Sequence, residues 1–384
     1  MRKKWLSLVG AVSSSSLRRW WLPGALLAGA PAMAASQQVL PISSEPPPCE
    51  VVLDEALSLG AMDDPGTIGS PSIITRLESG DFVLATPENG AEMLVYDGQG
   101  TYRESFGRSG EGPGEFFEPG HGMLRPLPDG GVLVLDPFIR RITHLSAAWE
   151  PMQLTDIGAR FTTNFMALAS GSGFVLAGWR RTDDSERAEI TQAIDLDGNT
   201  IEMIAVVPTD DAMRRFFPSP LATDEEGRVW RALPTEYAVE AWDPADPDRV
   251  VRLEGRPPWF TPGPPLEGYP LEAPAPSVIR GLKYAGGHLW IATTVADDQW
   301  RDAVADPVPF VPLDLTKMMD GVVEVIDVQT GRLVARTVHD EALWWTGDKS
   351  LLYTIREDGL VPRAVLFTPS LAGEDCPEMP PPPQ

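Results

Sequence analysis

The chain contains six similar units, each built from hairpins in which a glycine turn joins two strand-length apolar runs. At the front, Ile73 to Ala85 follows this pattern around Gly80, and Met93 to Phe106 repeats it around Gly98. One four-stranded sheet made of two such hairpins cannot bury both faces alone, whereas sheets stacked around an axis bury each other. Six units therefore predict an all-β fold, a six-bladed β-propeller. Later turn glycines mark the other units: Gly130, Gly171, Gly198, Gly227, Gly286, Gly331 and Gly347.

The sixth unit lacks its fourth strand. Residues 50–58 form a strand-like run that precedes the first unit and has no hairpin partner of its own. We expect this run to supply the missing strand, so that an N-terminal strand closes the ring and leaves no open seam between first and last blades.

Composition agrees with this architecture. The 384 residues include 35 glycines and 39 prolines, about a fifth of the chain. Length alone would allow two or three domains. So much glycine and proline favours many short strands joined by turns over helices.

The N-terminal residues have the pattern of an export signal. Residues 1–34 contain no acid, begin with Arg2, Lys3 and Lys4, and end in an apolar run closed by Ala32, Met33 and Ala34. Small residues at these last positions are typical of a signal-peptidase site. We predict an exported protein, periplasmic or secreted, by the general secretory or the twin-arginine route. The predicted segments are 1–34 signal peptide, 35–48 Pro/Ser-rich linker, 49–376 propeller and 377–384 Pro-rich flexible tail.

Charge limits the partners. Removing residues 1–34 takes away five basic groups and no acid, which moves the formal net charge from −24 to −29. Such a protein repels phosphate backbones and anionic lipid, so we expect no nucleic-acid partner. No membrane span is expected in the mature chain, because the apolar run before residue 34 is too short and holds Pro23 and Gly24.

Two cysteines flank the predicted ring. Cys49 and Cys376 are the only cysteines in the chain. Export places them in an oxidising compartment, and the closing strand brings residue 50 beside the chain that leaves Phe367. We therefore predict a disulfide between Cys49 and Cys376.

One unit carries a family pattern. Ser105 to Phe116 contains Phe-Gly followed by Gly-Pro-Gly-Glu-Phe, with Pro119 and the Asp129-Gly130 turn after it, and Leu133 to Asp136 and Arg141-Ile142 continue the pattern. This stretch resembles the NHL repeat of exported bacterial six-bladed propellers. The resemblance is strong over residues 105–145 and general over the other units. It implies the fold and a binding-scaffold role, and it implies no reaction.

The long connections favour one face. In a propeller, connections from an outer strand to the next inner strand, and from second to third strands, lie on the same face. The long ones here are of these kinds: 107–121, 178–190, 208–219, 254–277 and 294–321. Because binding residues concentrate on loops held by a rigid scaffold, we predict a non-catalytic scaffold for a protein, peptide or glycan ligand. Its candidate ligand-binding residues on this face are Arg140, Arg141, Arg180, Arg181, Arg214, Arg215, Trp259 and Trp300, of which Arg180, Arg214 and Trp259 are expected to be exposed.

Two alternatives stay open. The arginine pairs could be solvated charge balanced by neighbouring acids, since exposed ion pairs contribute little. The chain could also be a divalent-metal-assisted hydrolase or lyase, because related gluconolactonase- and lactonase-type propellers hold a cation at the mouth of their channel. A calcium-like ion there would use His121, Asn164 and Glu341, which lie at or near the starts of inner strands. Arg280 in the same ring would repel it, so the interpretation favours no catalysis.

Overall fold

The fold is seen in a computed structural model of the chain. It describes residues 36–66, 68–69, 72–158, 161–168, 172–181, 187–209, 219–243, 246–263, 273–301, 318–356, 361–374 and 376–377. The predicted signal peptide lies outside these residues, as does the tail beyond residue 377. No helix of the described chain is long and apolar enough to span a membrane.

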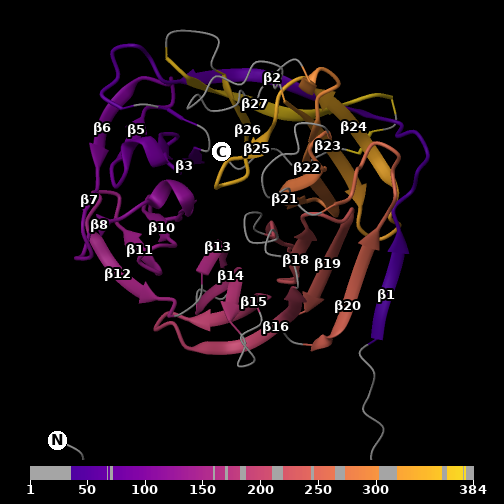
Figure 1. Cartoon of the computed structure of the whole chain (residues 1–384), viewed down its shortest axis with the longest axis horizontal. Coiled ribbons are helices and arrows are strands. Elements are labelled where there is room, and N and C mark those ends of the chain that lie inside the picture. The colour runs from indigo at the N-terminus through magenta and orange to yellow at the C-terminus, as the bar shows by residue number, and fades with distance from the viewer. Residues whose placement is uncertain are drawn as a thin grey trace, which may run out of the picture. The chain divides into compact units, whose positions relative to one another are not determined.

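Six antiparallel sheets form a ring, as predicted (Figure 1). The first three blades follow each other along the chain, each running from its inner to its outer strand. Blade 1 consists of β3 (Ile73–Arg76), β4 (Phe82–Ala85), β5 (Met93–Tyr96) and β6 (Tyr102–Phe106). Blade 2 consists of β9 (Met123–Pro126), β10 (Val132–Asp136), β11 (Arg141–Leu145) and β12 (Pro151–Asp156). Blade 3 consists of β13 (Phe161–Ala167), β14 (Gly173–Arg181), β15 (Arg187–Asp195) and β16 (Thr200–Thr209).

The other three blades complete the ring, and the chain's front end adds a strand to two of them. Blade 4 consists of β17 (Leu221–Thr223), β18 (Val229–Leu233), β19 (Ala238–Asp243), β20 (Asp246–Glu254) and, outside it, β1 (Ser36–Pro41). Blade 5 consists of β21 (Val278–Ala285), β22 (His288–Ala296), β23 (Met319–Asp327) and β24 (Leu333–His339). Blade 6 consists of β25 (Trp344–Trp345), β26 (Leu352–Arg356), β27 (Arg363–Ala372) and β2 (Glu50–Leu59).

The predicted closure of the ring is confirmed. Strand β2 pairs antiparallel with β27, from Glu50 opposite Ala372 to Leu59 opposite Ala364. The predicted disulfide joins Cys49, just before β2, to Cys376, just after β27, with 5.8 Å between their Cα atoms. First and last blades are thus held by a hydrogen-bonded ladder and a covalent bond.

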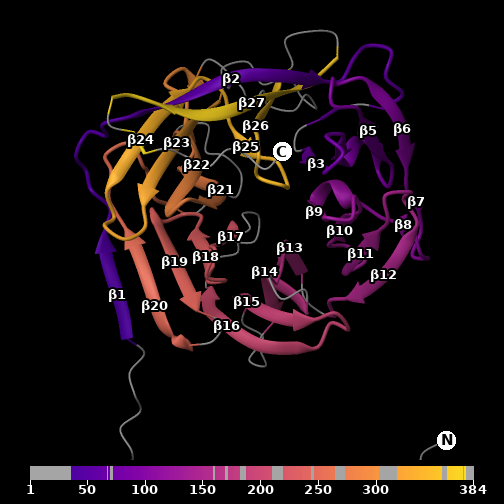
Figure 2. The same ribbon diagram turned by 180° about the vertical axis from the view of Figure 1, so that it is seen from behind.

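The expected linker contains a strand that sequence reasoning missed. Within residues 35–48, β1 pairs in parallel with the outer strand of blade 4, from Ser36 opposite Arg249 to Pro41 opposite Glu254. Figure 2 shows it running outside β20. The exposed edge of β20 offers unpaired backbone groups, and β1 covers them. Leu40 also packs against the core between blades 4 and 5.

The core lies between the blades. Each main cluster joins neighbouring sheets, such as Trp230 of blade 4 with Ile291 of blade 5, and Leu84 of blade 1 with Leu366 of blade 6. Strands buried on both faces carry consecutive buried residues, as Phe82 to Ala85 do. This packing makes the ring a rigid frame for its loops.

The two faces of the ring differ. Turns from first to second and from third to fourth strands are short, and Asp97 and Asp327 cap two of them by accepting backbone N–H bonds from residues two and more positions ahead. Such aspartate-capped turns serve to reverse the chain. The opposite face receives the long connections, including residues 107–122 with β7 (Arg108–Ser109), β8 (Glu115–Phe116) and η2 (Pro119–His121). The connection from β4 to β5, which contains η1 (Pro87–Asn89), lies on this long-loop face as well.

Candidate functional site

One buried carboxylate holds two neighbouring loops of the long-loop face. Asp136 is the last residue of β10 and only 1% exposed. Its Oδ2 accepts hydrogen bonds from the backbone N–H of Phe117 at 2.6 Å and of Glu118 at 3.3 Å. Its Oδ1 accepts from the N–H of Phe138 at 3.1 Å and of Ile139 at 3.4 Å. Loops 107–122 and 137–140 are therefore fixed to one strand end and to each other.

Arg141 is a second anchor of the longer loop. Its guanidinium donates to the carbonyl oxygens of Glu111 at 2.7 Å, Gly112 at 3.2 Å and Glu115 at 2.5 Å. Burial lowers the pKa of Arg141 from its usual value, against the charges of Asp136, Glu111 and Glu115, which raise it. Three backbone acceptors occupy this side chain, so its role in the fold is to shape the loop.

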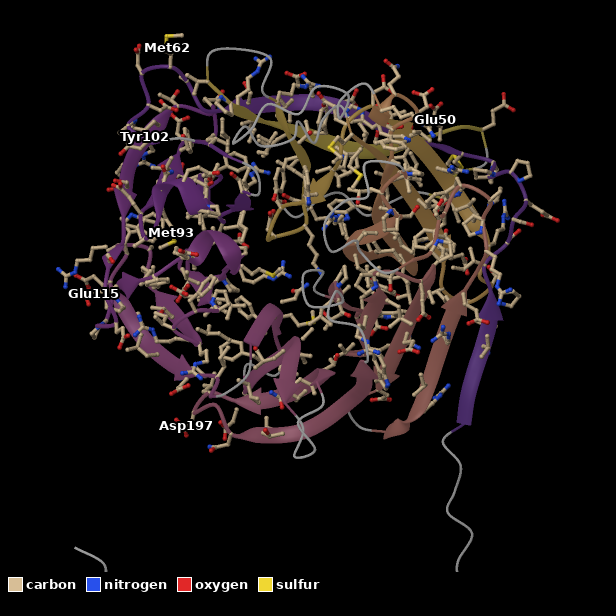
Figure 3. The ribbon with its side chains drawn as sticks, viewed as in Figure 1. Glu50, Met62, Met93, Tyr102, Glu115 and Asp197 are labelled. Atoms are coloured by element: carbon tan, nitrogen blue, oxygen red, sulfur yellow. A yellow bond between two sulfur atoms is a disulfide. The ribbon has the colours of Figure 1, made fainter. Side chains whose placement is uncertain are left out.

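Glu115 stiffens the same loop from within. Its carboxylate accepts from the N–H of Gly112 at 2.8 Å and from Nε of Arg108 at 3.0 Å. The hydrogen bond from the Gly112 N–H is the largest of the effects that lower the pKa of Glu115. Figure 3 shows Glu115 at the outer edge of the ring, where the loop leaves blade 1.

The two anchored loops present a pair of exposed aromatic rings. Phe117 is 52% exposed and Phe138 is 46% exposed. Their ring centroids are 5.8 Å apart, tilted by 51°. Arg140, also exposed, follows in the second loop with φ of 54°, and its carbonyl accepts a bond from the N–H of Ile157. We call Phe117, Phe138 and Arg140 the aromatic patch.

Sequence reasoning found Arg140 of this patch and missed both phenylalanines. Phe116 and Phe117 are adjacent, and Phe116 is fully buried, so the exposure of its neighbour could be inferred only from strand alternation at β8. Proximity of Phe138 needed the tertiary structure, because residues 117 and 138 lie on different loops.

The two predicted tryptophans pack inward. Trp300 is 6% exposed and sits in a cluster with Met318 and Met319. Trp259 is half-buried, lies edge-on to Tyr237 with centroids 5.5 Å apart, and has the Arg336 guanidinium 4.7 Å above its ring. Trp300 is therefore buried, and Trp259, which was expected to be exposed, is only partly so, since these large apolar rings gain more from packing than from solvent. Arg214 and Arg215 lie outside the described residues, as do the side chains of Arg180 and Arg181.

The residues of the metal alternative have other partners. Asn164 is buried, its Nδ2 donates to the carbonyl of Ser219 at 3.2 Å, and its Oδ1 accepts from Arg125 at 3.4 Å. Both oxygens of Glu341 accept from Nε of Arg356, at 2.7 and 3.1 Å. The side chain of His121 lies outside the described part of the structure.

Electrostatics at Glu341 follow from these contacts. Burial would raise the pKa of Glu341, but hydrogen bonds from His339 and Arg356 outweigh it and lower the pKa. The oxygens of Glu341 are therefore already used by neighbouring side chains of the protein. Within the described ranges, no group of three or more acidic, histidine or cysteine side chains is arranged to hold a metal. Of the three predicted ligands, the two with described side chains, Asn164 and Glu341, are thus bonded to other groups of the protein.

Comparison with known proteins found similarity at the level of the fold. No protein-family model matches the sequence, and no curated protein matches it. A member of the DUF4221 family from Bacteroides vulgatus is similar in structure, with TM-score 0.54 and 12% identity, over 85% of this chain and 99% of that one. A protein from Bacteroides fragilis described as a putative exported protein has TM-score 0.50 and 10% identity, over 88% of this chain and all of that one. At such identities the likeness concerns the fold alone.

Proposed function

We propose that this chain is an exported, non-catalytic binding scaffold that recognises a protein, peptide or glycan ligand through its long-loop face. The aromatic patch is the observation that carries this proposal. Aromatic residues are enriched in interfaces, and an exposed pair offers apolar area that a ligand can cover. An apolar peptide segment is the ligand that such a pair fits best.

Rigidity supports the same proposal. Asp136 holds both loops that bear the phenylalanines through four backbone hydrogen bonds. Side chains fixed before binding lose less conformational entropy when a ligand arrives, and this raises affinity. Arg140 adds an exposed guanidinium that can pair with a carboxylate of the ligand.

Export is supported by two features. The Cys49–Cys376 disulfide suits an oxidising compartment outside the cytoplasm. The acid-free, apolar N-terminal segment with its Ala32-Met33-Ala34 end has the pattern of a cleaved signal. We propose that the mature protein is periplasmic or secreted, and fractionation of expressing cells would distinguish these two locations.

A peptide-display library and a glycan array test the binding role. Both are probed with the mature protein, with a Phe117→Ser/Phe138→Ser variant, and with a Met152→Ser/Leu154→Ser control. Met152 and Leu154 are 64% and 40% exposed on the outer strand of the same blade, so the control removes similar apolar surface elsewhere.

We expect ligands that bind the mature protein and the control alike and bind the patch variant at least about tenfold more weakly, as for a central interface residue. Ligands that bind all three proteins equally would contradict the use of this patch. Turnover of any enriched ligand by the purified protein would contradict the non-catalytic role.

A further inference from the structure

One turn crosses the centre of the ring. Thr346 to Leu351 connects β25 to β26 in blade 6, and we call it the central turn. Its Gly347 N–H donates to the carbonyl of Ile74 in blade 1 at 2.6 Å, and its Gly347 carbonyl accepts from Arg125 of blade 2. Nζ of Lys349 donates to the carbonyl of Leu221 in blade 4. A turn that contacts blades on both sides, including two that are not its neighbours, must lie at the axis.

The figures agree with this position. In Figure 1 the yellow chain next to β25 bends toward the middle of the ring, inside the innermost strands. There is no space for a side chain at Gly347, because a Cβ would lie 2.1 Å from the carbonyl oxygen of Leu124. The residue type at position 347 is thus dictated by close approach of the turn to β9.

Positive charge gathers around the central turn. Arg125, Lys283 and Lys349 come from blades 2, 5 and 6, and each is half-buried. Burial, followed by the charges of Arg125 and Lys283, lowers the pKa of Lys349 well below its usual value. Burial lowers the pKa of Arg125 to about 10, although Asp348 opposes this. Arg125 and Lys283 therefore lie close enough to Lys349 to disfavour its charged form.

Only one carboxylate among the described residues balances them. Asp348 raises the pKa of Arg125 and of Lys283, while its Oδ1 accepts from the N–H of Arg76 at 3.3 Å. The cluster thus carries an excess of positive charge inside a protein whose net charge is −24. Like charges in a low-dielectric setting cost free energy unless an anion compensates them.

Lysine usage makes this cluster unusual within its own chain. Beyond residue 34 the sequence has 23 arginines and only three lysines, Lys283, Lys317 and Lys349. Two of the three lysines meet at the ring centre. Arginine serves the surface ion pairs of this protein, as Arg252 does with Glu236, Glu240 and Glu254. A compact ammonium with rotatable donors suits the coordination of a small anion.

Some hydrogen-bond donors at the centre have no acceptor among the residues that the structure describes. Arg125 donates three of its five N–H groups, to the carbonyls of Gly347 and Phe165 and to Asn164. Lys349 uses one of its three N–H groups on Leu221, and Lys283 makes cation–π contacts with Trp345 at 5.2 Å and Trp290 at 6.0 Å.

Two buried hydroxyls close to the central turn also lack partners. Thr75 and Ser350 are 0% and 4% exposed, and within the described chain neither Oγ has a hydrogen-bond partner. The Oγ1 of Thr75 lies 2.8 Å from the position that a Cβ on Gly347 would take. Buried polar groups are nearly always satisfied, so unpaired ones beside excess positive charge point to a bound group.

We propose that the ring centre binds a small ligand through an oxyanion group, a phosphate, sulfate or carboxylate, with the ammonium groups of Lys349 and Lys283 as its charged donors. Arg125 holds the central turn in place and adds fixed positive charge. This site is distinct from the aromatic patch, since it is formed by inner strands and by a turn between a first and a second strand. It goes beyond the scaffold role and stands or falls separately from it.

Anion titration of the mature protein tests this site. The protein is exchanged into chloride buffer and titrated with phosphate, sulfate or succinate at constant ionic strength, with calorimetry and thermal unfolding as readouts. Lys349→Met and Lys283→Met remove the proposed donors. Arg332→Gln removes an exposed charge on a short turn and serves as the matched control.

We expect at least one of the three anions to bind saturably and to raise the melting temperature more than chloride does. The anion that binds best identifies the oxyanion source. Each lysine variant should bind it at least about tenfold more weakly, while the Arg332 variant binds as the parent does. In chloride, the lysine variants should melt no lower than the parent, because they relieve repulsion between like charges.

Three results would overturn the proposal. Absence of saturable binding by all three anions is one, and equal binding by parent and lysine variants is the second. The third is a lower melting temperature of both lysine variants in chloride with unchanged anion response, which would make the central turn a purely structural plug. Loss of peptide binding in the Phe117→Ser/Phe138→Ser variant would concern the scaffold role alone and would not change the outcome of the anion titration.

Discussion

Glu324 offers a sharp test of how burial controls stability in this ring. It lies on β23, is 2% exposed, and accepts a hydrogen bond from the Tyr237 hydroxyl of blade 4. Nε of Arg336 is 3.8 Å from its other oxygen. Burial raises the pKa of Glu324 to about 7, and the bond from Tyr237 and the charge of Arg336 limit the rise.

The sign of the pH effect follows from that shift. Because the folded pKa lies above the ordinary value of 4.5, the folded protein holds one more proton than the unfolded chain between those pH values. The protonated form stabilises the fold fully below about pH 4.5, and this contribution is lost as pH rises through 7. At about 1.4 kcal/mol per pKa unit, the loss from pH 5 to pH 8 is on the order of 2–3 kcal/mol.

Glu324→Gln replaces the titratable carboxyl group by a neutral amide of nearly the same shape. Urea unfolding, followed by tryptophan fluorescence at pH 5 and pH 8, measures the free energy of unfolding of the parent, this variant and an exposed control, Glu78→Gln. We expect Glu324→Gln to gain about 2–3 kcal/mol relative to the parent on going from pH 5 to pH 8. The control should show no such change. Equal differences between Glu324→Gln and the parent at both pH values would refute the burial argument.

Two other predictions concern the chain that precedes the first blade. Cys49→Ala/Cys376→Ala, or reduction of the parent, should lower the free energy of unfolding by about 3–5 kcal/mol, since the disulfide closes a loop of 327 residues; urea unfolding with and without reductant measures this, and identical curves would contradict it. Gly331→Ala should destabilise the protein by about 2–3 kcal/mol more than Gly227→Ala. Both glycines have positive φ, but a Cβ at 331 would lie 2.3 Å from the carbonyl of Pro41, whereas at 227 it meets nothing within 4 Å. Equal melting temperatures of the two variants would show that β1 does not pack there.

Local chemistry made much of the architecture predictable. Asp-Gly turns such as Asp97-Gly98 occur where the chain reverses, because aspartate caps the turn and glycine leaves it unobstructed. Strand-length apolar runs between them gave the number of blades. The missing fourth strand of the last unit and the unpaired run at 50–58 could each be seen in the sequence, and together they predicted β2 and its neighbouring disulfide.

The binding side chains were less predictable than the frame. Arg141 and Trp259 lie where the long loops were expected, yet one shapes a loop and the other packs into the core. Residue type does not reveal whether a guanidinium or an indole faces solvent, because that depends on the acceptors and apolar surfaces around it. Asn164 likewise looked able to bind a metal, and the structure places it beside Arg125.

By itself, the sequence determined the all-β repeat, the order of the blades and the closing strand, because turn chemistry and strand period act over a few neighbouring residues. Only the tertiary structure decided that β1 covers β20, that Phe117 meets Phe138, and that Lys283, Lys349 and Arg125 share the ring centre. These groups come from loops or blades far apart in the chain. Their proximity results from ring closure, and no local pattern encodes which side chains will meet across the axis.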